Sequence, residues 1–326
     1  MNTTVVFSQR DRILGGLWGS LVGDALGVPV EFKDRATVQA DPVREMRGFG
    51  SHRQPAGTWS DDSSLLLCSA ESLIHHEFNT EDMGKRFVRW HQEEIWTPHG
   101  KVFDVGVSTA RALGRIASGM RAEVAGGDDQ FSNGNGSLMR ILPVALRFAH
   151  LPPKPALEKI HRASALTHRH PRSQMACGFF TLLVRELING KIIPDAYQQT
   201  IIAFRAFYES EAWWSAEWDY FQMLLAGDLA RRPESDIDSS GYVIHTLAAS
   251  LWCLLTTENY RDCVLKAVNL GGDTDTTGCV AGGLAGVVYG LTSIPADWIQ
   301  QLARKGDVDC LFHDFADLCE STIGTK

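Results

Sequence analysis

Several features of secretion and redox chemistry are missing from this sequence of 326 residues. Its seven cysteines include no Cys-x-x-Cys pair and are odd in number, which favours buried, reduced thiols over a disulfide framework. The first residues, MNTTVVFSQRDR, lack a basic segment followed by an apolar core, so we expect no signal peptide and a cytoplasmic location. Basic residues are in deficit as well. A net charge of −8 argues against nucleic acid or an anionic membrane as the main partner.

The longest uncharged stretch has few large aliphatic side chains. Residues 276–296 are numerous enough to cross a membrane, but they include five glycines, several hydroxyl groups and a proline. We therefore expect a helix buried in the protein core rather than a membrane span.

Alternation of apolar and polar residues with period two is also scarce, whereas apolar residues recur at steps of three and four. The first such segment contains Ile13, Leu14, Leu17, Trp18 and Leu21. Further helical patterns occupy residues 65–78, 83–95, 107–119, 138–150, 155–167, 173–190, 196–209, 242–255 and 259–270. The sequence predicts an all-α fold.

The connecting segments rich in proline and glycine do not divide the chain. Residues 41–58, 121–137 and 231–241 are predicted to be loops inside one domain, because none combines length with a change in composition. We expect residues 1–326 to form a single compact domain.

Glycine recurs at every fourth position in two segments. The two sets are Gly15, Gly19, Gly23 and Gly27, and Gly278, Gly282, Gly286 and Gly290. A glycine costs a helix interior up to about 1 kcal/mol relative to alanine, so eight of them need a reason. Small residues on one face let two helix backbones approach closely, and we expect both helices to pack tightly in the middle of the fold.

Acidic residues lie near the ends of these glycine-containing segments. Glu31 follows the first, the sequence GTWSDD places Asp61 and Asp62 before another apolar helix, and LGGDTDTTG places Asp273 and Asp275 before the second. A single Ser60 or Asp61 would be an ordinary helix N-cap. A repeated pair of carboxylates with a hydroxyl group, from Ser60 or Thr276, instead resembles the oxygen-only shell that hard cations prefer.

Charge balance supports two cations. The carboxylates of Glu31, Asp61, Asp62, Asp273 and Asp275 would repel one another strongly if they converged, and two divalent ions would leave a net charge of about −1. Neither motif contains histidine or cysteine, which favours Mg²⁺ or Mn²⁺ over zinc. The sequence thus predicts a centre of two divalent ions.

Five segments together resemble the ADP-ribosylglycohydrolase family, which includes the dinitrogenase reductase-activating glycohydrolase and the ADP-ribosyl-acceptor hydrolases. In order, they are GDALGVPVEF, GTWSDDSSLLLC, SNGNGSLMRILP, LTHRHP and LGGDTDTTG, within about residues 11–290. The resemblance implies an all-α fold with a binuclear magnesium or manganese centre in a central cleft. The metal ligands it implies are Glu31, Ser60, Asp61, Asp62, Asp273, Asp275 and Thr276, with Ser60 standing where the family more often has threonine.

The resemblance also implies residues that contact the substrate. The glycine-rich loop with Asn135, Gly136 and Ser137 would bind the ribose and diphosphate, and its backbone N–H groups can form an anion cradle without a basic side chain. His168 matches a family histidine near the active cleft. Asp104, in a sequence resembling FDIG, would lie near the reacting sugar. Without the resemblance, the loop could be an ordinary helix-capping turn and Asp104 a helix or turn cap.

The implied reaction is hydrolysis of the bond between ADP-ribose and an acceptor, most plausibly arginine on a protein. The catalytic candidates are Asp104, Glu31 and Asp62, and Asp104 or Glu31 would exchange the proton of the departing guanidine. The modified protein and a cognate ADP-ribosyltransferase would be partners.

Other functions stay open. The family fold could serve a toxin-neutralising immunity protein or a regulatory ADP-ribose binder, and the substrate could be a small molecule or ADP-ribosylated serine. DTDTT also fits a haloacid-dehalogenase-like phosphatase motif, but that motif should follow a β-strand. The tryptophan-rich stretch 209–221 either stacks on adenine or packs in the core.

Overall fold

The computed structural model describes residues 7–209 and 212–323. In this part of the chain the regular structure is helical, and only three isolated β-bridges accompany the helices. The all-α prediction is confirmed. Because no strand precedes the DTDTT sequence within these residues, the phosphatase interpretation is wrong.

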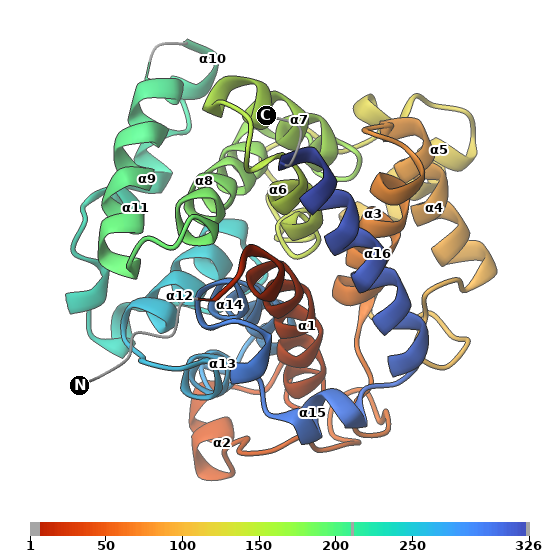
Figure 1. The fold of residues 1–326 in the computed structure, drawn as a ribbon, viewed down its shortest axis with the longest axis vertical. Coiled ribbons are helices and arrows are strands. Elements are labelled where there is room, and N and C mark those ends of the chain that lie inside the picture. Colours follow the sequence, from red (N-terminus) through yellow and green to blue (C-terminus); the bar gives the residue numbers. More distant parts are fainter. Residues whose placement is uncertain (1–6, 210–211, 324–326) are drawn as a thin grey trace.

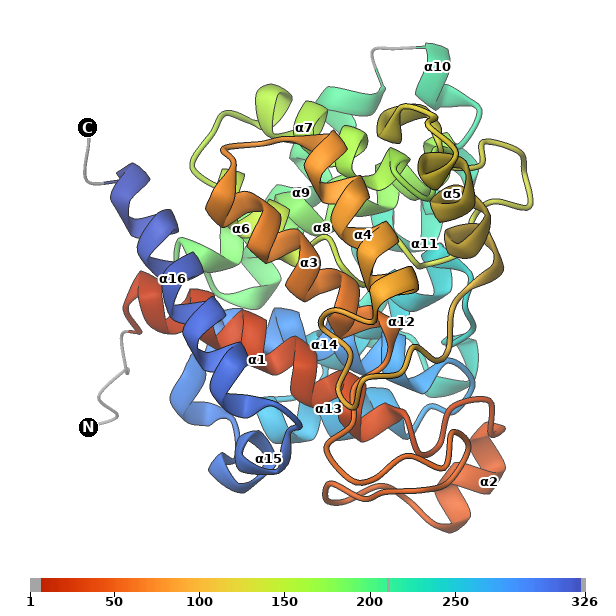
Figure 2. The same cartoon turned by 90° about the vertical axis from the view of Figure 1, so that its right-hand side faces the viewer.

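The helices enclose one continuous core (Figures 1 and 2). The α-helices are α1 (Gln9–Gly27), α2 (Arg35–Ala40), α3 (Asp61–His75), α4 (Thr80–Glu93), α5 (Val107–Ala117), α6 (Leu142–Phe148), α7 (Pro153–Ala165), α8 (Pro171–Ile188), α9 (Ile193–Tyr208), α10 (Ala212–Ser215), α11 (Gln222–Leu225), α12 (Val243–Leu255), α13 (Tyr260–Val268), α14 (Thr274–Tyr289), α15 (Ala296–Gln301) and α16 (Lys305–Ile323). Short 3-10 turns are η1 (Ala122–Val124), η2 (Trp218–Phe221), η3 (Leu229–Arg231), η4 (Glu234–Asp236) and η5 (Leu291–Ser293).

Every predicted helical segment contains a helix. The structure differs from the prediction at the start of α6 and in the presence of α16. Helix α6 begins at Leu142, so residues 138–141 form a turn instead of its first residues. Helix α16 was not predicted, although its buried residues Val308, Phe312 and Phe315 follow helical spacing. It packs against α3 and α1 and thereby extends the core beyond the residues that carry the family resemblance.

The uncharged stretch 276–296 is only partly one helix. Helix α14 is buried from Thr274 to Val287 and ends at Tyr289, because Gly290 adopts a positive φ of 73° that stops the helix. In the described part of the chain, no helix is long and apolar enough to cross a membrane. All seven cysteines are free thiols and six of them are buried, in agreement with the prediction of reduced cysteines.

The glycine-rich helices α1 and α14 run antiparallel in direct backbone contact. A Cβ atom added to Gly19 would lie 2.3 Å from the carbonyl oxygen of Gly282, and one added to Gly23 would lie 2.0 Å from that of Gly278. Real Cβ atoms do not approach a carbonyl oxygen so closely, so a side chain at these positions would push the helices apart. The prediction of close packing is confirmed. Gly290 lies at the C-cap of α14, and its carbonyl carbon would be 2.8 Å from a Cβ atom added to Gly15.

The antiparallel arrangement decides where the acidic residues lie. The C-terminal end of α1, which leads to Glu31, is beside the N-terminal end of α14, which carries Asp275. A Cβ atom added to Gly27 would lie 2.4 Å from the Cα of Asp275. The glycine contact therefore brings together acidic segments that are far apart in the sequence.

We expect Gly19→Ala to lower the free energy of unfolding by about 3 kcal/mol, because its methyl group has no space between the two backbones. Gly114→Ala is the matched control. Gly114 is exposed within α5 and a Cβ atom there meets nothing within 4 Å, so the control should be neutral or stabilise by up to about 1 kcal/mol. Urea unfolding followed by circular dichroism measures both. Equal midpoints for the two variants would contradict the backbone contact.

Candidate metal centre and cleft

A cleft of about 360 Å³ opens where the ends of α1, α3 and α14 meet. Its volume lies in the usual range for small-molecule sites. None of the lining residues, all in the described part of the chain, is lysine or arginine. Five lining residues carry a carboxyl group, and they are Glu31, Asp61, Asp62, Asp104 and Asp273.

Buried Asp24 fixes the first turn of α3. Its carboxylate accepts hydrogen bonds from the backbone N–H of Ser60 at 3.0 Å, from that of Ser63 at 3.1 Å and from the Ser63 hydroxyl at 2.5 Å. The side chain of Ser60 caps the helix by accepting from the N–H of Asp62 at 3.2 Å, and Ser60 does not line the cleft. Asp24 therefore positions Asp61 and Asp62. The sequence contained this residue but gave no sign of its partners.

A contact between α3 and α14 connects the two acidic motifs. The hydroxyl of Thr276 donates a hydrogen bond to Asp62 at 3.3 Å, and that of Thr274 donates to the carbonyl oxygen of Gly27 at 2.8 Å. The predicted convergence of the two motifs therefore occurs. Asp275 is buried beneath the floor of the cleft, whereas Asp273 and Thr276 line it.

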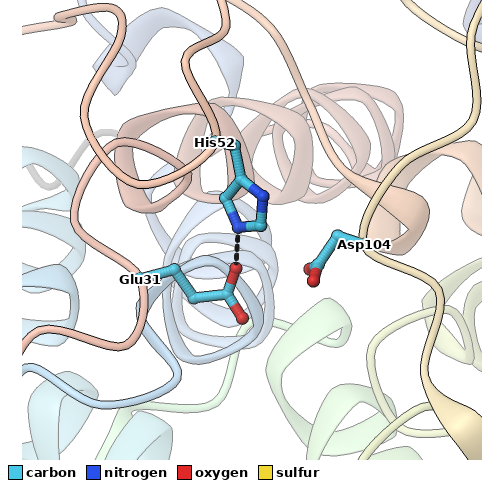
Figure 3. Close-up of side chains that lie close together, drawn as sticks. All are labelled: Glu31, His52 and Asp104. Carbon is cyan, nitrogen blue, oxygen red and sulfur yellow. Dashed lines mark hydrogen bonds and ion pairs between the residues drawn. The ribbon is translucent and has the colours of Figure 1, made fainter.

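Glu31 belongs to two compact groups of possible ligands. Single oxygen atoms of Glu31, Asp273 and Asp275 lie within 4.8 Å of one another, and so do ligand atoms of Glu31, His52 and Asp104. Figure 3 shows the second group, with the His52 ring bonded to the Glu31 carboxylate and the Asp104 carboxylate pointing into the same space. His52 was missed from the sequence, because it lies alone in the loop 41–58 outside every motif.

Burial of these acids raises their pKa values. Desolvation, reinforced by Asp104 and Asp273, raises the pKa of Glu31 to about 10. Desolvation is also the main cause that raises the pKa of Asp61, Asp62 and Asp275 well above the ordinary value, and neighbouring carboxylates add to it. In water-free surroundings, several like charges can coexist only if they take up protons or bind cations.

Three buried carboxylate oxygens have no hydrogen-bond partner within the described residues. They are Oδ2 of Asp62, Oδ1 of Asp273 and Oδ2 of Asp275. A buried oxygen without a hydrogen-bond partner costs free energy, and all three oxygens belong to one acidic cluster. The atoms that this cluster could offer to a metal ion are hard oxygen ligands. The residues present therefore fit divalent cations such as Mg²⁺ or Mn²⁺.

The glycine-rich loop lines the cleft beside Asp273. The Asn135 amide donates to Asp273 at 3.0 Å and to Thr246 at 2.9 Å, so this side chain positions a candidate metal ligand. Gly136 and His168 line the cleft, and a Cβ atom on Gly136 would lie 2.8 Å from the His168 ring. The loop therefore requires glycine at this position.

Ser137 differs from its expected role. Its side chain is fully buried, accepts a hydrogen bond from Ser164 at 2.9 Å and contacts the Cys177 thiol at 3.4 Å, behind the cleft. Ser137 does not line the cleft, unlike its neighbours Asn135 and Gly136.

The tryptophan-rich stretch lies away from the cleft. Trp214 is buried and packs on His161 at 4.8 Å between ring centroids, and Trp218 packs on Phe204 at 5.9 Å. Neither lines the cleft, so core packing explains these two residues and stacking on adenine there does not. Residues 210 and 211 of the stretch lie outside the described part.

Comparisons with known proteins place the whole chain in one family. A family model described as ADP-ribosylglycohydrolase matches residues 7–324. The ADP-ribosylarginine hydrolase Tri1 of Pseudomonas putida is 30% identical over 94% of this chain and 78% of its own length. The ADP-ribosyl-[dinitrogen reductase] glycohydrolase of Rhodospirillum rubrum is 32% identical over 91% of this chain and 92% of its own. A solved structure, "ADP-ribosylglycohydrolase-related protein complex", has a TM-score of 0.80 at 34% identity, over 95% of this chain and 99% of that one.

We expect the free energy of unfolding of the metal-free protein to fall as the pH rises from about 4 towards 10. Unfolded aspartates and glutamates lose their protons near pH 4, whereas the folded protein keeps them up to about 6 on Asp24 and about 10 on Glu31. The folded state thus binds more protons across this range, and its stability decreases as protons are withdrawn.

Saturating Mn²⁺ or Mg²⁺ should remove most of this pH dependence, because the cation takes the place of the protons. Urea unfolding at several pH values, with the metal or with a chelator, measures the difference. A pH dependence that is the same with and without metal would contradict a cation site among these carboxylates.

Proposed function

The chain belongs to the ADP-ribosylglycohydrolase family, and on this premise we propose that it is a metal-dependent hydrolase that removes ADP-ribose from arginine side chains of modified proteins. The observation that carries the proposal is the convergence of buried carboxylates, three of them with a partnerless oxygen, on a cleft of about 360 Å³. The P. putida relative, named an ADP-ribosylarginine hydrolase, supports arginine as the acceptor.

The acidic residues would hold two divalent cations. The ligands would be drawn from Glu31, Ser60, Asp61, Asp62, Asp273, Asp275 and Thr276. Bound there, Mg²⁺ or Mn²⁺ would lower the pKa of a water molecule and orient the ribose hydroxyl groups. Ser60 already uses its hydroxyl as a helix cap, so its contribution would be shared with that role.

The residues of the chain supply the rest of the reaction. As the water oxygen bonds to the anomeric carbon, the bond from that carbon to the guanidine nitrogen breaks and its electron pair stays on the nitrogen. Asp62 and its neighbours stabilise the positive charge that develops on the sugar. The attacking water loses a proton and the departing guanidine nitrogen gains one, and Asp104 or Glu31 transfers it, because both carboxyl groups line the cleft within reach of each other.

The diphosphate would be bound without a basic side chain. The loop with Asn135 and Gly136 lines the cleft, and the N–H group of Gly136 has no backbone acceptor among the described residues. Such N–H groups can bind phosphate oxygens. His168 adds a side-chain contact beside this loop.

The rim of the cleft suits a planar cation as the acceptor. Phe32 lines the cleft although its side chain is 71% exposed, and both Phe32 and Asp104 have a positive φ, of 63° and 54°. A positive φ strains the backbone of a residue other than glycine, and such strain at a binding site indicates that the residue has a role there. An exposed aromatic ring beside carboxylates attracts a guanidinium group more strongly than a neutral serine oxygen.

Two alternatives are weaker. A non-catalytic binder or immunity protein would have no need of a complete set of metal ligands, and all the candidates implied by the family resemblance are present. Serine-linked or small-molecule substrates have no guanidinium group for the Phe32 ring to bind. In the proposed role, an ADP-ribosyltransferase in the same compartment would supply the substrate, and the free cysteines fit the cytoplasm.

Purified protein should release ADP-ribose from arginine-linked ADP-ribosylated protein in the presence of Mg²⁺ or Mn²⁺, and much more slowly after chelation. Asp275→Asn should fold yet lose at least about a hundredfold in rate, because metal and water are no longer held together. Asp195→Asn is the control, since Asp195 is an exposed acid in the first turn of α9, and should be fully active. Full activity of Asp275→Asn without metal would contradict the proposal. Activity of the wild-type protein only on serine-linked substrate would show that the acceptor is serine and not arginine.

Phe32→Ala should raise the KM for ADP-ribosylarginine about two- to fivefold with little change in kcat, because the ring contacts the acceptor without taking part in bond cleavage. Phe49→Ala is the matched control. Phe49 is 69% exposed with a φ of 66° but does not line the cleft. The same change in both variants, or an unchanged KM in Phe32→Ala, would rule out recognition of the acceptor by this ring.

A further inference from the structure

Arg140 is a fully buried cation whose presence the hydrolytic mechanism does not explain. No carboxylate among the described residues forms an ion pair with it. Its guanidinium contacts the carbonyl oxygen of Ala163 at 3.3 Å, stacks 4.6 Å from the Phe87 ring and donates to the Thr167 hydroxyl at 2.7 Å. A buried charge without a counter-ion costs several kcal/mol, which suggests a function for it.

The hydrogen bond to Thr167 has a defined direction. A guanidinium group has only donors, so the Thr167 oxygen must accept from Arg140. The proton of the Thr167 hydroxyl then needs an acceptor of its own, and Nδ1 of His168 lies 2.9 Å away. Within the described residues the hydroxyl has no other acceptor, and leaving its proton buried and unpaired would cost about 1–3 kcal/mol. Nδ1 of His168 is therefore the acceptor.

This direction determines the tautomer of the imidazole ring. If Nδ1 accepts a hydrogen bond, the neutral ring carries its proton on Nε2. Burial, with a contribution from the charge of Arg140, lowers the pKa of His168 to about 3, so the ring is neutral at physiological pH.

The protonated nitrogen lies on the cleft side of the ring. His168 lines the cleft beside the glycine-rich loop. A Cβ atom added to Gly134 would lie 3.3 Å from Nε2, and one added to Gly136 would lie 2.8 Å from the adjacent carbon Cε1. Only glycine leaves space at these two positions for a ligand to approach this edge of the ring.

We propose that Arg140, Thr167 and His168 form a fixed relay that keeps Nε2 of His168 as a permanent hydrogen-bond donor to an oxygen of the bound ADP-ribosyl group. This inference rests on the proposed function and adds two positioning residues behind the cleft. A neutral donor fits this position, because it can bind a phosphate or ribose oxygen without exchanging protons with the carboxylates of the cleft. The cation two hydrogen bonds away polarises the donor in the same direction.

The tautomer can be measured directly. In protein labelled with ¹⁵N-histidine, long-range proton–nitrogen correlation should show Nδ1 of His168 as the unprotonated nitrogen and Nε2 as the protonated one. The spectrum of His168→Gln assigns the signal by its loss. A wild-type spectrum with the proton on Nδ1 would overturn the relay.

A pair of variants tests the part played by Thr167. Thr167→Val keeps the shape of the side chain but removes the hydroxyl, so the proton of His168 should move to Nδ1 or become shared between the nitrogens. The affinity for free ADP-ribose, measured by calorimetry with Mg²⁺, should fall about tenfold, as expected for one lost hydrogen bond. Thr167→Ser should restore both tautomer and affinity. A Thr167→Val protein with the wild-type tautomer and affinity would overturn the proposal.

Two further outcomes remain decisive. If Thr167→Val does not fold, the relay is tested by the tautomer spectrum of the wild-type protein and by the ADP-ribose affinities of two other variants. His168→Gln keeps an N–H donor, and His168→Met has none. Equal affinities of these two variants would overturn the donor role. If the wild-type protein does not bind ADP-ribose at all, the proposed function fails, and the tautomer spectrum still decides whether the relay exists.

Discussion

The site depends on one contact, the direct packing of the α1 backbone on the α14 backbone. Glycines such as Gly19 and Gly282 remove the side chains that would separate the two helices, and the antiparallel direction brings the end of one helix to the start of the other. Glu31 and Asp275 are thereby brought together although they are far apart in the sequence. Asp24 then attaches the start of α3 to the same place through its bonds to Ser60 and Ser63. Helix packing thus brings the acidic cluster together, with Glu31 in the turn after α1 and Asp273 directly before α14.

Electrostatics and helix geometry have opposite effects in this cluster. Burial and mutual repulsion disfavour the charged forms of Glu31, Asp62 and Asp275 and raise their pKa values. The N-terminal ends of α3 and α14, in contrast, present the positive ends of their helix dipoles to the carboxylates. That contribution is about 1 kcal/mol or less per group, too small to offset the desolvation of several charges. The remaining electrostatic cost favours the binding of cations by the cluster.

The sequence was sufficient for whatever depends on regular spacing. Helical periodicity predicted the fold class and most helices, and the glycine repeat predicted a close helix contact before any partner was known. Paired acids at two helix starts predicted their own convergence, because such charges need a common counter-ion. Helix α16 was overlooked because acidic residues such as Asp309 and Asp314 interrupt its apolar stripe, although they lie on its solvent side.

Residues held by irregular backbone could not be found in this way. Phe32 lines the cleft and His52 contacts Glu31, both from loops that no periodic pattern predicts. The partners of Arg140 become visible only in three dimensions. Ser137 is the opposite case, because its motif suggests contact with the substrate while its hydroxyl bonds to Ser164 in the packed helices. Local motifs indicate which backbone approaches a ligand. They do not indicate which way each side chain turns.

The division between a helical floor and a rim made of loops has a consequence for how such proteins diversify. Phe32 lies on a connecting segment, so exchanging it leaves the backbone contact of α1 and α14 untouched. New acceptors could therefore be accommodated in evolution, or selected from a randomised library of rim residues, while the bond-breaking apparatus beneath is inherited unchanged.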